Sequence, residues 1–335
     1  MSQKILLVTG ATGKQGRALI NALRADVAET EANPGTSQFH ILALTRKAGS
    51  PAARRLAEEK NVEVVEGNLD DPQSLRKVFE DAKSKGGVWG VFCVLAFPGL
   101  GVSGDDEEKQ GKTVADLALE FGVSSFIFSS YERGGESHDD HVTLDHLAKV
   151  RIERHVKDLG TKGLSWTILR PGFFMENFDG AIGAIAAGVL KAGLKDTTSL
   201  RLIAVDDIGH VAAEVFKNPE AYLSKVIVVV GDTITTGQME AAYKTATGRS
   251  LPSIPKILGR ALISINRHTK ALITEIERVH RISADHENED GDVAVTEVYP
   301  NMTTFGAWAA QSRKDENHNP NWNHVSIGRL ITGRQ

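Results

Sequence analysis

The chain has 335 residues, of which 41% are hydrophobic and 24% charged, so it contains enough apolar material for a large core. Lys and Arg number 39 against 43 Asp and Glu, and the resulting net charge of −4 argues against a dedicated nucleic-acid binder. The single cysteine, Cys93, excludes an intramolecular disulfide and a Cys-based metal cluster. The longest apolar stretches are too short for a signal peptide or a membrane span. We predict a soluble, cytoplasmic protein, with the nucleus as an alternative location, that binds neither membrane nor nucleic acid.

Short apolar runs alternate with amphipathic segments through the first half of the chain. The runs are nearly continuous in Val, Ile, Leu and Phe, which is typical of parallel strands buried on both faces. Ser50-Pro51 and Asp71-Pro72 each read as an N-cap residue followed by the first helical position. The predicted strands are Ile5–Val8, His40–Leu44, Val62–Val65, Val88–Leu95, Ser125–Ser129 and Leu164–Leu169, and the predicted helices are Lys14–Arg24, Ala52–Lys60, Gln73–Ala82, Glu107–Phe121 and Thr143–Leu159. This alternation predicts an α/β fold with a Rossmann-like, doubly wound parallel sheet over residues 1–170.

The rest of the chain is less regular. Residues 26–37 are polar and are predicted to form a surface loop before the second strand. Residues 171–310 are predicted to form a smaller, mainly helical lobe for a substrate or partner, with some strands returning to the sheet, and residues 311–335 a polar tail. The predicted helices in this half are Ala181–Ala192, Gly237–Thr247, Lys256–Asn266 and Lys270–Ile282, and the predicted strand is Lys225–Val230. Val205–Gly209 is predicted to form a turn that leads into a helix through Val215.

Three glycines separate the first predicted strand from the first helix. Gly10 permits a tight turn, Gly13 lets the backbone approach a pyrophosphate, and Gly16 allows the helix to pack closely on the strand. The helix N-terminus presents free N–H groups to the anion. This arrangement predicts dinucleotide binding, with a purely structural turn as the alternative. The residues predicted to contact the cofactor here are Gly10, Ala11, Thr12, Gly13, Lys14, Gln15 and Gly16.

The end of the second predicted strand indicates which dinucleotide is bound. An acidic residue there would hold the ribose 2′-OH of NAD, but this strand ends in Leu44-Thr45-Arg46-Lys47. Arg46 suits a 2′-phosphate because its guanidinium binds two oxygens, and Lys14 could add a second charge. We therefore predict NADP(H) in preference to NAD(H), a solvated basic strand end being the alternative. Asp70 is predicted to accept a hydrogen bond from the adenine amino group, while Asp71 caps the next helix. The remaining predicted cofactor contacts are Asn68, Leu69, Ala96, Lys149 and Phe173.

Four segments together resemble the NmrA-like family, an atypical branch of the short-chain dehydrogenase/reductase superfamily. They are VTGATGKQG at Val8–Gly16, VVEGNLDD at Val64–Asp71, QGKTVADLALEFGVSSFIFSS at Gln110–Ser130 and TILRPGFFMENF at Thr167–Phe178. The resemblance implies a Rossmann-like NAD(P)-binding domain with a smaller C-terminal lobe. It also implies one of two roles: a redox-sensing regulator that binds a partner protein, such as a GATA-type activator, or an NADPH-dependent reductase of quinones or aromatic metabolites.

The catalytic dyad of typical short-chain dehydrogenases is incomplete. That dyad is Tyr-x-x-x-Lys on one helix face; here Lys149 matches the Lys, but Asp145 stands four residues before it. Lys149 is therefore predicted to bind ribose hydroxyls in a cofactor sensor, or to act with His146 or Tyr131 in a reductase. A structural ion pair with Glu153, one turn on, is the third alternative. Because the tyrosine is missing, we favour the regulator and hold the NADPH-dependent oxidoreductase as the alternative, with Lys149 and Tyr131 as candidate catalytic residues.

Three other features of the sequence bear on chemistry. Phe173, Phe174 and Phe178 follow the sixth strand and could wall a cleft for a flat ligand, the alternative being packing between the lobes. The run 138–141 contains two His and two Asp, but adjacent residues rarely converge on one ion, so no metal site is predicted. Cys93 lies in an apolar strand and is predicted to be a buried small hydrophobe.

Overall fold

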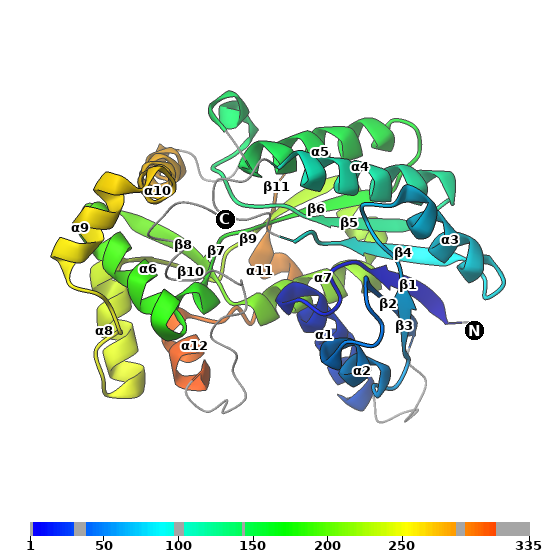
Figure 1. Cartoon of the computed structure of the whole chain (residues 1–335), viewed down its shortest axis with the longest axis horizontal. Coiled ribbons are helices and arrows are strands. Elements are labelled where there is room, and N and C mark those ends of the chain that lie inside the picture. Colours follow the sequence, from blue (N-terminus) through cyan, green and yellow to red (C-terminus); the bar gives the residue numbers. More distant parts are fainter. Residues whose placement is uncertain (1–2, 30–37, 97–103, 143–144, 286–291, 313–335) are drawn as a thin grey trace.

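The computed structural model describes residues 3–29, 38–96, 104–142, 145–285 and 292–312. Its main sheet is parallel, and within these residues the strand order is β11-β9-β6-β5-β4-β1-β2-β3 (Figure 1). The strands are β1 Lys4–Val8, β2 Phe39–Thr45, β3 Val62–Glu66, β4 Val88–Cys93, β5 Ser125–Ser129, β6 Trp166–Pro171, β9 Lys225–Val229 and β11 Asp292–Ala294. The order reverses between β1 and β4, which is the switch point of a doubly wound fold, so the predicted fold class is confirmed.

Helices cover both faces of this sheet. On one face lie α3 Pro72–Lys83, α4 Asp105–Glu120 and α5 Asp145–Gly160, and on the other α1 Lys14–Glu29, α2 Pro51–Ala57, α7 Val205–Lys217 and α11 Val295–Val298. Strand β1 shows why its sequence is continuously apolar: Ile5 and Leu7 enter the core of the first face, while Leu6 and Val8 enter that of the second.

The caps predicted from sequence are present. Ser50 accepts a hydrogen bond from the Ala53 backbone N–H, and Asp71 accepts from two N–H groups of the first turn of α3. The predicted loop over residues 26–37 was wrong at its start, because α1 continues through Glu29. Residues 25–29, Ala-Asp-Val-Ala-Glu, contain neither Gly nor Pro, so nothing there ends the helix. Residues 30–37 lie outside the described residues.

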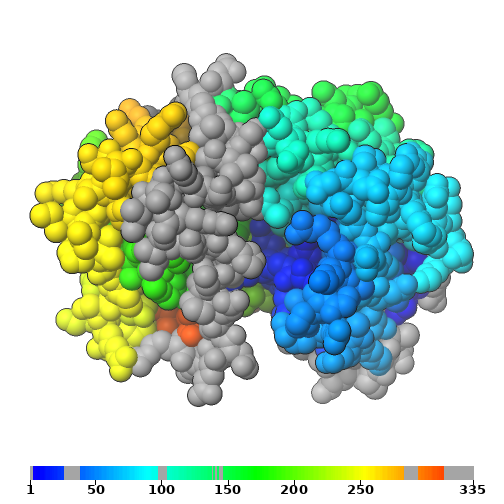
Figure 2. Space-filling model, in the orientation of Figure 1, coloured from blue at the N-terminus to red at the C-terminus, as the bar shows by residue number. Residues whose placement is uncertain are grey.

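The remaining elements form a second lobe with its own core. A three-stranded sheet in the order β10-β8-β7 pairs β8 antiparallel to β10 and parallel to β7. These strands and the surrounding helices are β7 Phe173–Phe174, β8 Ser199–Ile203, β10 Asp232–Thr235, α6 Gly180–Gly193, α8 Thr236–Thr247, α9 Lys256–Ile265, α10 Arg267–Asp285 and α12 Phe305–Ser312. The lobe is mainly helical, while β9 and β11 return to the main sheet. Figure 2 shows the N-terminal half of the chain at the right of the molecule and this lobe at the left.

Candidate functional site

The glycine turn joins β1 to α1 at the switch point of the sheet. Gly10 has a φ of +58°, in the left-handed region, and its carbonyl accepts a hydrogen bond of 2.8 Å from the Gly13 N–H. A Cβ on Gly16 would lie 2.5 Å from the Gly10 carbonyl oxygen and 2.7 Å from the Ala11 Cα. Both contacts are with backbone that cannot move aside, so the turn requires glycine at these two positions.

Thr9 anchors the turn to the neighbouring strand. Its buried hydroxyl donates to the Val94 carbonyl at 2.8 Å and accepts from the Val94 N–H at 2.9 Å. This pair of hydrogen bonds holds together the carboxyl ends of β1 and β4, the two strands at the switch point. This role of Thr9 was not predicted from the sequence, although its place directly before the first glycine of the turn could have indicated it.

Lys14 connects the turn to the second lobe. Burial lowers the pKa of Lys14, and the carboxylates of Glu176, Asp179 and Asp206 oppose that shift. Burial in turn raises the pKa of Glu176 to about 7, while its Oε1 accepts the Val205 N–H at 3.0 Å. Lys14 therefore lies in the field of acids that follow β7 and of Asp206 in α7.

Residues predicted to contact the adenosine end of the cofactor lie at the ends of β2 and β3. Arg46 directly follows β2 and is exposed. In the β3–α3 loop, Asn68 Oδ1 accepts the Asp70 N–H at 3.2 Å, and Asp70 Oδ1 accepts from Gln110 Nε2 at 2.6 Å. Leu69 packs against the core, and Ala96 is exposed just beyond β4. An adenine amino group would share the Asp70 carboxylate with Gln110, a contact between segments 40 residues apart that sequence did not suggest.

Lys149 forms an ion pair, but with a different carboxylate from the one named in the third alternative. Its Nζ donates to Glu107 Oε1 at 2.6 Å, whereas Glu153 binds two arginines and not Lys149. Glu107 lies in the first turn of α4 and only 2% of its side chain is exposed. The charges of Lys149 and Glu107 both act on Cys93, the last residue of β4, which places the pair near the carboxyl end of that strand. Cys93 itself is buried, as predicted, and burial raises its pKa to about 12.

Three hydroxyl side chains follow one another at the end of β5. Ser129 Oγ donates to Gln15 Oε1 at 2.6 Å, which links this strand end to the helix of the glycine turn. The Ser130 and Tyr131 hydroxyls are buried and make no hydrogen bond within the described residues. The Tyr131 ring stacks on His146, with ring centroids 4.4 Å apart. Burial raises the pKa of Tyr131 above its usual range, so the phenol is a weak proton donor in this state.

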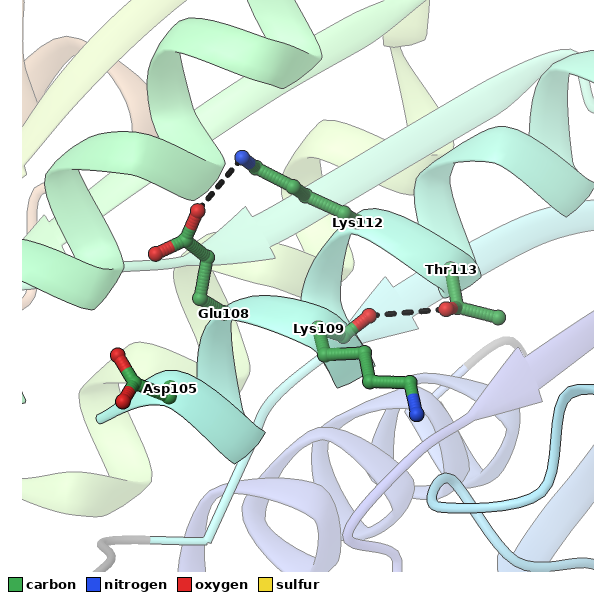
Figure 3. Close-up of a pocket in the computed structure, with 5 residues that line it drawn as sticks. All are labelled: Asp105, Glu108, Lys109, Lys112 and Thr113. Atoms are coloured by element: carbon green, nitrogen blue, oxygen red, sulfur yellow. Dashed lines mark hydrogen bonds and ion pairs between the residues drawn. The ribbon is translucent and has the colours of Figure 1, made fainter. Parts of the chain in front are cut away.

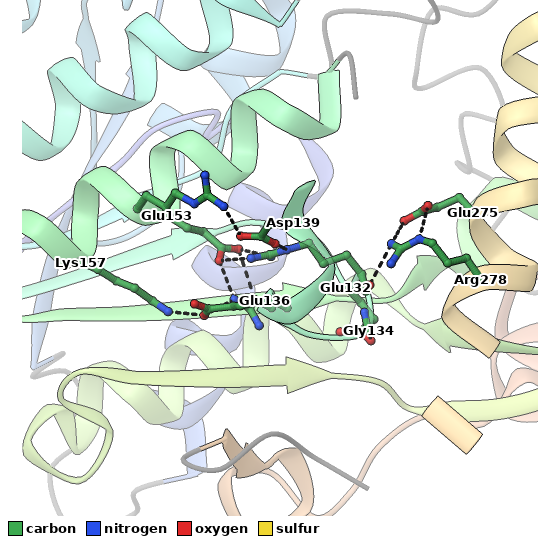
Figure 4. A network of polar contacts seen from close by, with 11 residues as sticks. Glu132, Gly134, Glu136, Asp139, Glu153, Lys157, Glu275 and Arg278 are labelled. Atoms are coloured by element: carbon green, nitrogen blue, oxygen red, sulfur yellow. Dashed lines mark hydrogen bonds and ion pairs between the residues drawn. The ribbon is translucent and has the colours of Figure 1, made fainter. Parts of the chain in front are cut away.

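A buried ionic network fixes the segment that carries Tyr131 (Figure 4). Arg133 binds Asp139 at 2.6 Å and holds both oxygens of Glu153, at 2.8 and 2.9 Å. Arg170, from β6, binds the same Glu153 at 2.7 Å. Arg278 of α10 donates to the Arg133 carbonyl at 3.0 Å, so the second lobe also supports this segment.

The aromatic residues after β6 pack mainly within the lobes. Phe178 is 4% exposed and makes an edge-to-face contact with Phe305, with centroids 5.5 Å apart. Phe173 is partly buried against Phe178, and Phe174 packs against the core on the α1 face of the main sheet. Of the three, only Phe173 and Phe174 keep surface that a ligand could contact.

A hollow of about 430 Å³ lies on α4 (Figure 3). It is lined by Asp105, Glu108, Lys109, Lys112 and Thr113. Glu108 is occupied by Lys112 at 2.6 Å and by Arg151 at 2.9 Å. None of the five lining residues belongs to the predicted site, so this hollow and the glycine turn are separate features.

The fold and the glycine turn define a Rossmann-like, doubly wound α/β protein. The profile of the NmrA-like family matches residues 2–309, and the chain belongs to this family. Among curated relatives, the oxidoreductase ptmS of Penicillium ochrochloron is 24% identical, and the oxidoreductase FrzB of Cladobotryum sp. 27%. The first alignment covers 74% of each chain, and the second 73% of this chain and 74% of the relative.

Solved structures share the fold. The negative transcriptional regulator NmrA in complex with NAD has a TM-score of 0.65 at 18% identity, covering 93% of this chain and 95% of that one. The triphenylmethane reductase of Citrobacter sp. has a TM-score of 0.65 at 19% identity, covering 93% and 100%. Within the described residues, no helix is both long and apolar enough to cross a bilayer.

Proposed function

We propose that this protein binds NADP(H) at the glycine turn and acts as an NADPH-dependent oxidoreductase on a quinone or an aromatic carbonyl compound. The observation that carries the proposal is the pairing of Lys149: Glu107 holds its ammonium at 2.6 Å, and the charges of both residues act on Cys93 at the end of β4. The oxidoreductase names of the curated relatives also support it.

The turn fits a dinucleotide. A Cβ on Gly13 would meet only the Gly10 carbonyl oxygen, at 3.1 Å, and Gly13 is exposed, so its outer side is open to a close-approaching phosphate. The first N–H groups of an α-helix have no partner within the helix, and those of α1 begin at this point. A pyrophosphate would accept hydrogen bonds from these groups, and the ribose hydroxyls of the nicotinamide half from Lys149.

Reduction of such a substrate would require few catalytic groups from the protein. A bound reduced nicotinamide would supply the hydride, and the residues of the chain would position the nicotinamide ring and exclude competing water. Lys149 would hold the ribose, and its charge would stabilise negative charge that develops on a substrate oxygen. Because Tyr131 is a weak donor and position 145 has no tyrosine, the product would take its proton from solvent.

Replacing Lys149 with alanine tests this role. We expect turnover of NADPH with a panel of quinones and aromatic carbonyls to fall by about 100-fold or more. The measurement is kcat and KM from the loss of NADPH absorbance.

The matched control is Lys191→Ala. Lys191 is also part of a partly buried Lys–Glu pair, with Nζ 2.5 Å from Glu240 Oε2 and 18% of its side chain exposed against 16% for Lys149, but it lies in α6. Equal loss of turnover in both variants would mean that ion-pair loss alone, and not the place of Lys149, reduces activity.

Replacing Arg46 with alanine tests the choice of cofactor. Arg46 is exposed at the end of β2, where it can bind a 2′-phosphate through two oxygens. We expect the affinity for NADP+ to fall about tenfold, which is about 1.4 kcal/mol, while NAD+ binding stays within twofold. Calorimetric titration with both cofactors measures this. Equal weakening of both would contradict the 2′-phosphate role.

A second candidate is a cofactor-sensing regulator that binds a partner protein, such as a GATA-type activator. The observation that favours it is the absence of a proton-donating tyrosine: Asp145 replaces it, and the Tyr131 phenol is buried with a raised pKa. Tight NADP+ binding with no turnover across the whole panel would support the regulator over the reductase.

A further inference from the structure

The outer face of α9 is apolar, although most of it is in contact with solvent. Ile257, Leu258 and Ile265 are 76%, 52% and 66% exposed, and they account for three of the four large hydrophobic side chains that are exposed within the described residues. With 3.6 residues per turn, these positions fall on one side of the helix, together with the exposed Ala261.

The opposite face of α9 is fixed to the lobe. A Cβ on Gly259 would lie 2.6 Å from the Gly188 carbonyl oxygen of α6, and Leu262 and Ile263 pack against the lobe core. The helix is therefore apolar on two sides, of which packing within the chain explains only one. A partner that needs to surround the helix cannot bind it, because α6 already occupies the inner face.

Positive charge surrounds this face. Residues 241–274 contain no Asp or Glu, in a chain whose net charge is −4. The cations of this stretch are Lys244, Arg249, Lys256, Arg260, Arg267 and Lys270. The acids that border the stretch are already paired, Glu240 with Lys191 at 2.5 Å and Glu275 with Arg278 at 2.9 Å. The stretch is therefore positively charged, and the two bordering acids do not neutralise it.

We propose that the outer face of α9 docks on an anionic phospholipid surface, contrary to the prediction from composition that the protein binds no membrane. Figure 1 places α9 at one end of the molecule. A helix with exposed Ile and Leu side chains and flanking Lys and Arg suits the interfacial region of a bilayer, where apolar side chains enter and cations meet headgroups. A second copy of the chain would bring the same cations face to face, and like charges disfavour that arrangement.

The test is sedimentation of the full-length protein with two kinds of vesicle. One kind contains phosphatidylcholine alone, and the other also contains about 30% phosphatidylserine, which makes its surface anionic. We expect binding only to the anionic vesicles, and loss of that binding as salt rises, because charge attraction is screened. Ile257→Ser/Ile265→Ser should lower the partition coefficient about tenfold or more, because both apolar side chains are expected to enter the bilayer interface.

Matched variants separate this face from general effects. Lys256→Glu/Arg260→Glu should weaken binding at least about 20-fold, whereas Lys60→Glu/Lys162→Glu changes the net charge equally at exposed sites elsewhere and should have a much smaller effect. Leu223→Ser removes the fourth exposed hydrophobic side chain, which is 47% exposed and lies outside α9.

Circular dichroism and NADP+ titration verify that each variant is folded. No binding of the wild-type protein to anionic vesicles would overturn the proposal, and so would equal binding by the α9 variants and their controls. Binding to an acidic polypeptide such as polyglutamate without binding to vesicles would overturn it in favour of a protein partner.

Discussion

Replacing Gly16 with alanine will weaken dinucleotide binding at least about tenfold and lower the free energy of unfolding by about 1–3 kcal/mol. The added Cβ would lie 2.5 Å from the Gly10 carbonyl oxygen and 2.7 Å from the Ala11 Cα. Neither atom is the end of a flexible side chain, so α1 has to move away from β1. That movement separates the helix N–H groups from the phosphate position that the turn defines.

The measurements are NADP+ titration and urea denaturation of both proteins. Gly49→Ala is the control, because a Cβ on Gly49 would meet no heavy atom within 4 Å and its φ lies outside the left-handed region. We expect Gly49→Ala to leave binding unchanged. Normal NADP+ affinity in Gly16→Ala would contradict the assignment of this turn as the pyrophosphate site.

Replacing Glu153 with glutamine will strongly lower the free energy of unfolding. The side chain is 2% exposed and binds Arg133 and Arg170, which are themselves 1% and 0% exposed. Its removal leaves two buried guanidinium groups to share Asp139 and the more exposed Glu136. Removing one partner of a buried ion pair destabilises proteins by about 3–5 kcal/mol, and we expect a loss of that size at pH 7.

This loss should depend on pH in a defined direction. Burial by itself raises the pKa of Glu153, but Arg133 and Arg170 outweigh burial and bring it to about 2, below the ordinary 4.5. A carboxyl group with a depressed folded-state pKa contributes its full stability above about pH 4.5 and loses it as the pH falls toward 2. The difference between wild type and Glu153→Gln should therefore narrow below pH 4.5.

Urea denaturation at a series of pH values measures both effects. Glu120→Gln is the control, because Glu120 also binds an arginine through two oxygens, Arg76 at 2.5 Å each, but is 51% exposed. Solvent screens that pair, so its loss should change stability little. A Glu153→Gln protein as stable as wild type would mean that the buried arginines are satisfied without this carboxylate.

The network also bears on the candidate site. It fixes the segment that follows Tyr131 through Asp139, and Arg278 extends it to the second lobe. Partial loss of turnover in Glu153→Gln under conditions where the protein is still folded would indicate that this segment positions the residues at the end of β5.

Much of the fold was predictable from local sequence. Continuous apolar runs such as Ile5–Val8 indicate strands buried on both faces, and Asp71-Pro72 marks a helix start, because both signals depend only on neighbouring residues. Strand β8 was missed. Ser199–Ile203 is short, and its pairing with β7 and β10 comes from distant parts of the chain. A few residues of local pattern do not specify such pairing.

For the candidate site, the sequence by itself determined the glycine turn. Gly10 adopts a left-handed φ, and Gly16 leaves no space for a Cβ, so both positions depend on the absence of a side chain. The tertiary structure decided the partners of the charged residues. Lys149 pairs with Glu107, 42 residues away, and not with Glu153 on its own helix, because Arg133 and Arg170 already hold Glu153. Charge pairing acts through space between elements, so only the packing of α4, α5 and β6 determines which carboxylate each cation reaches.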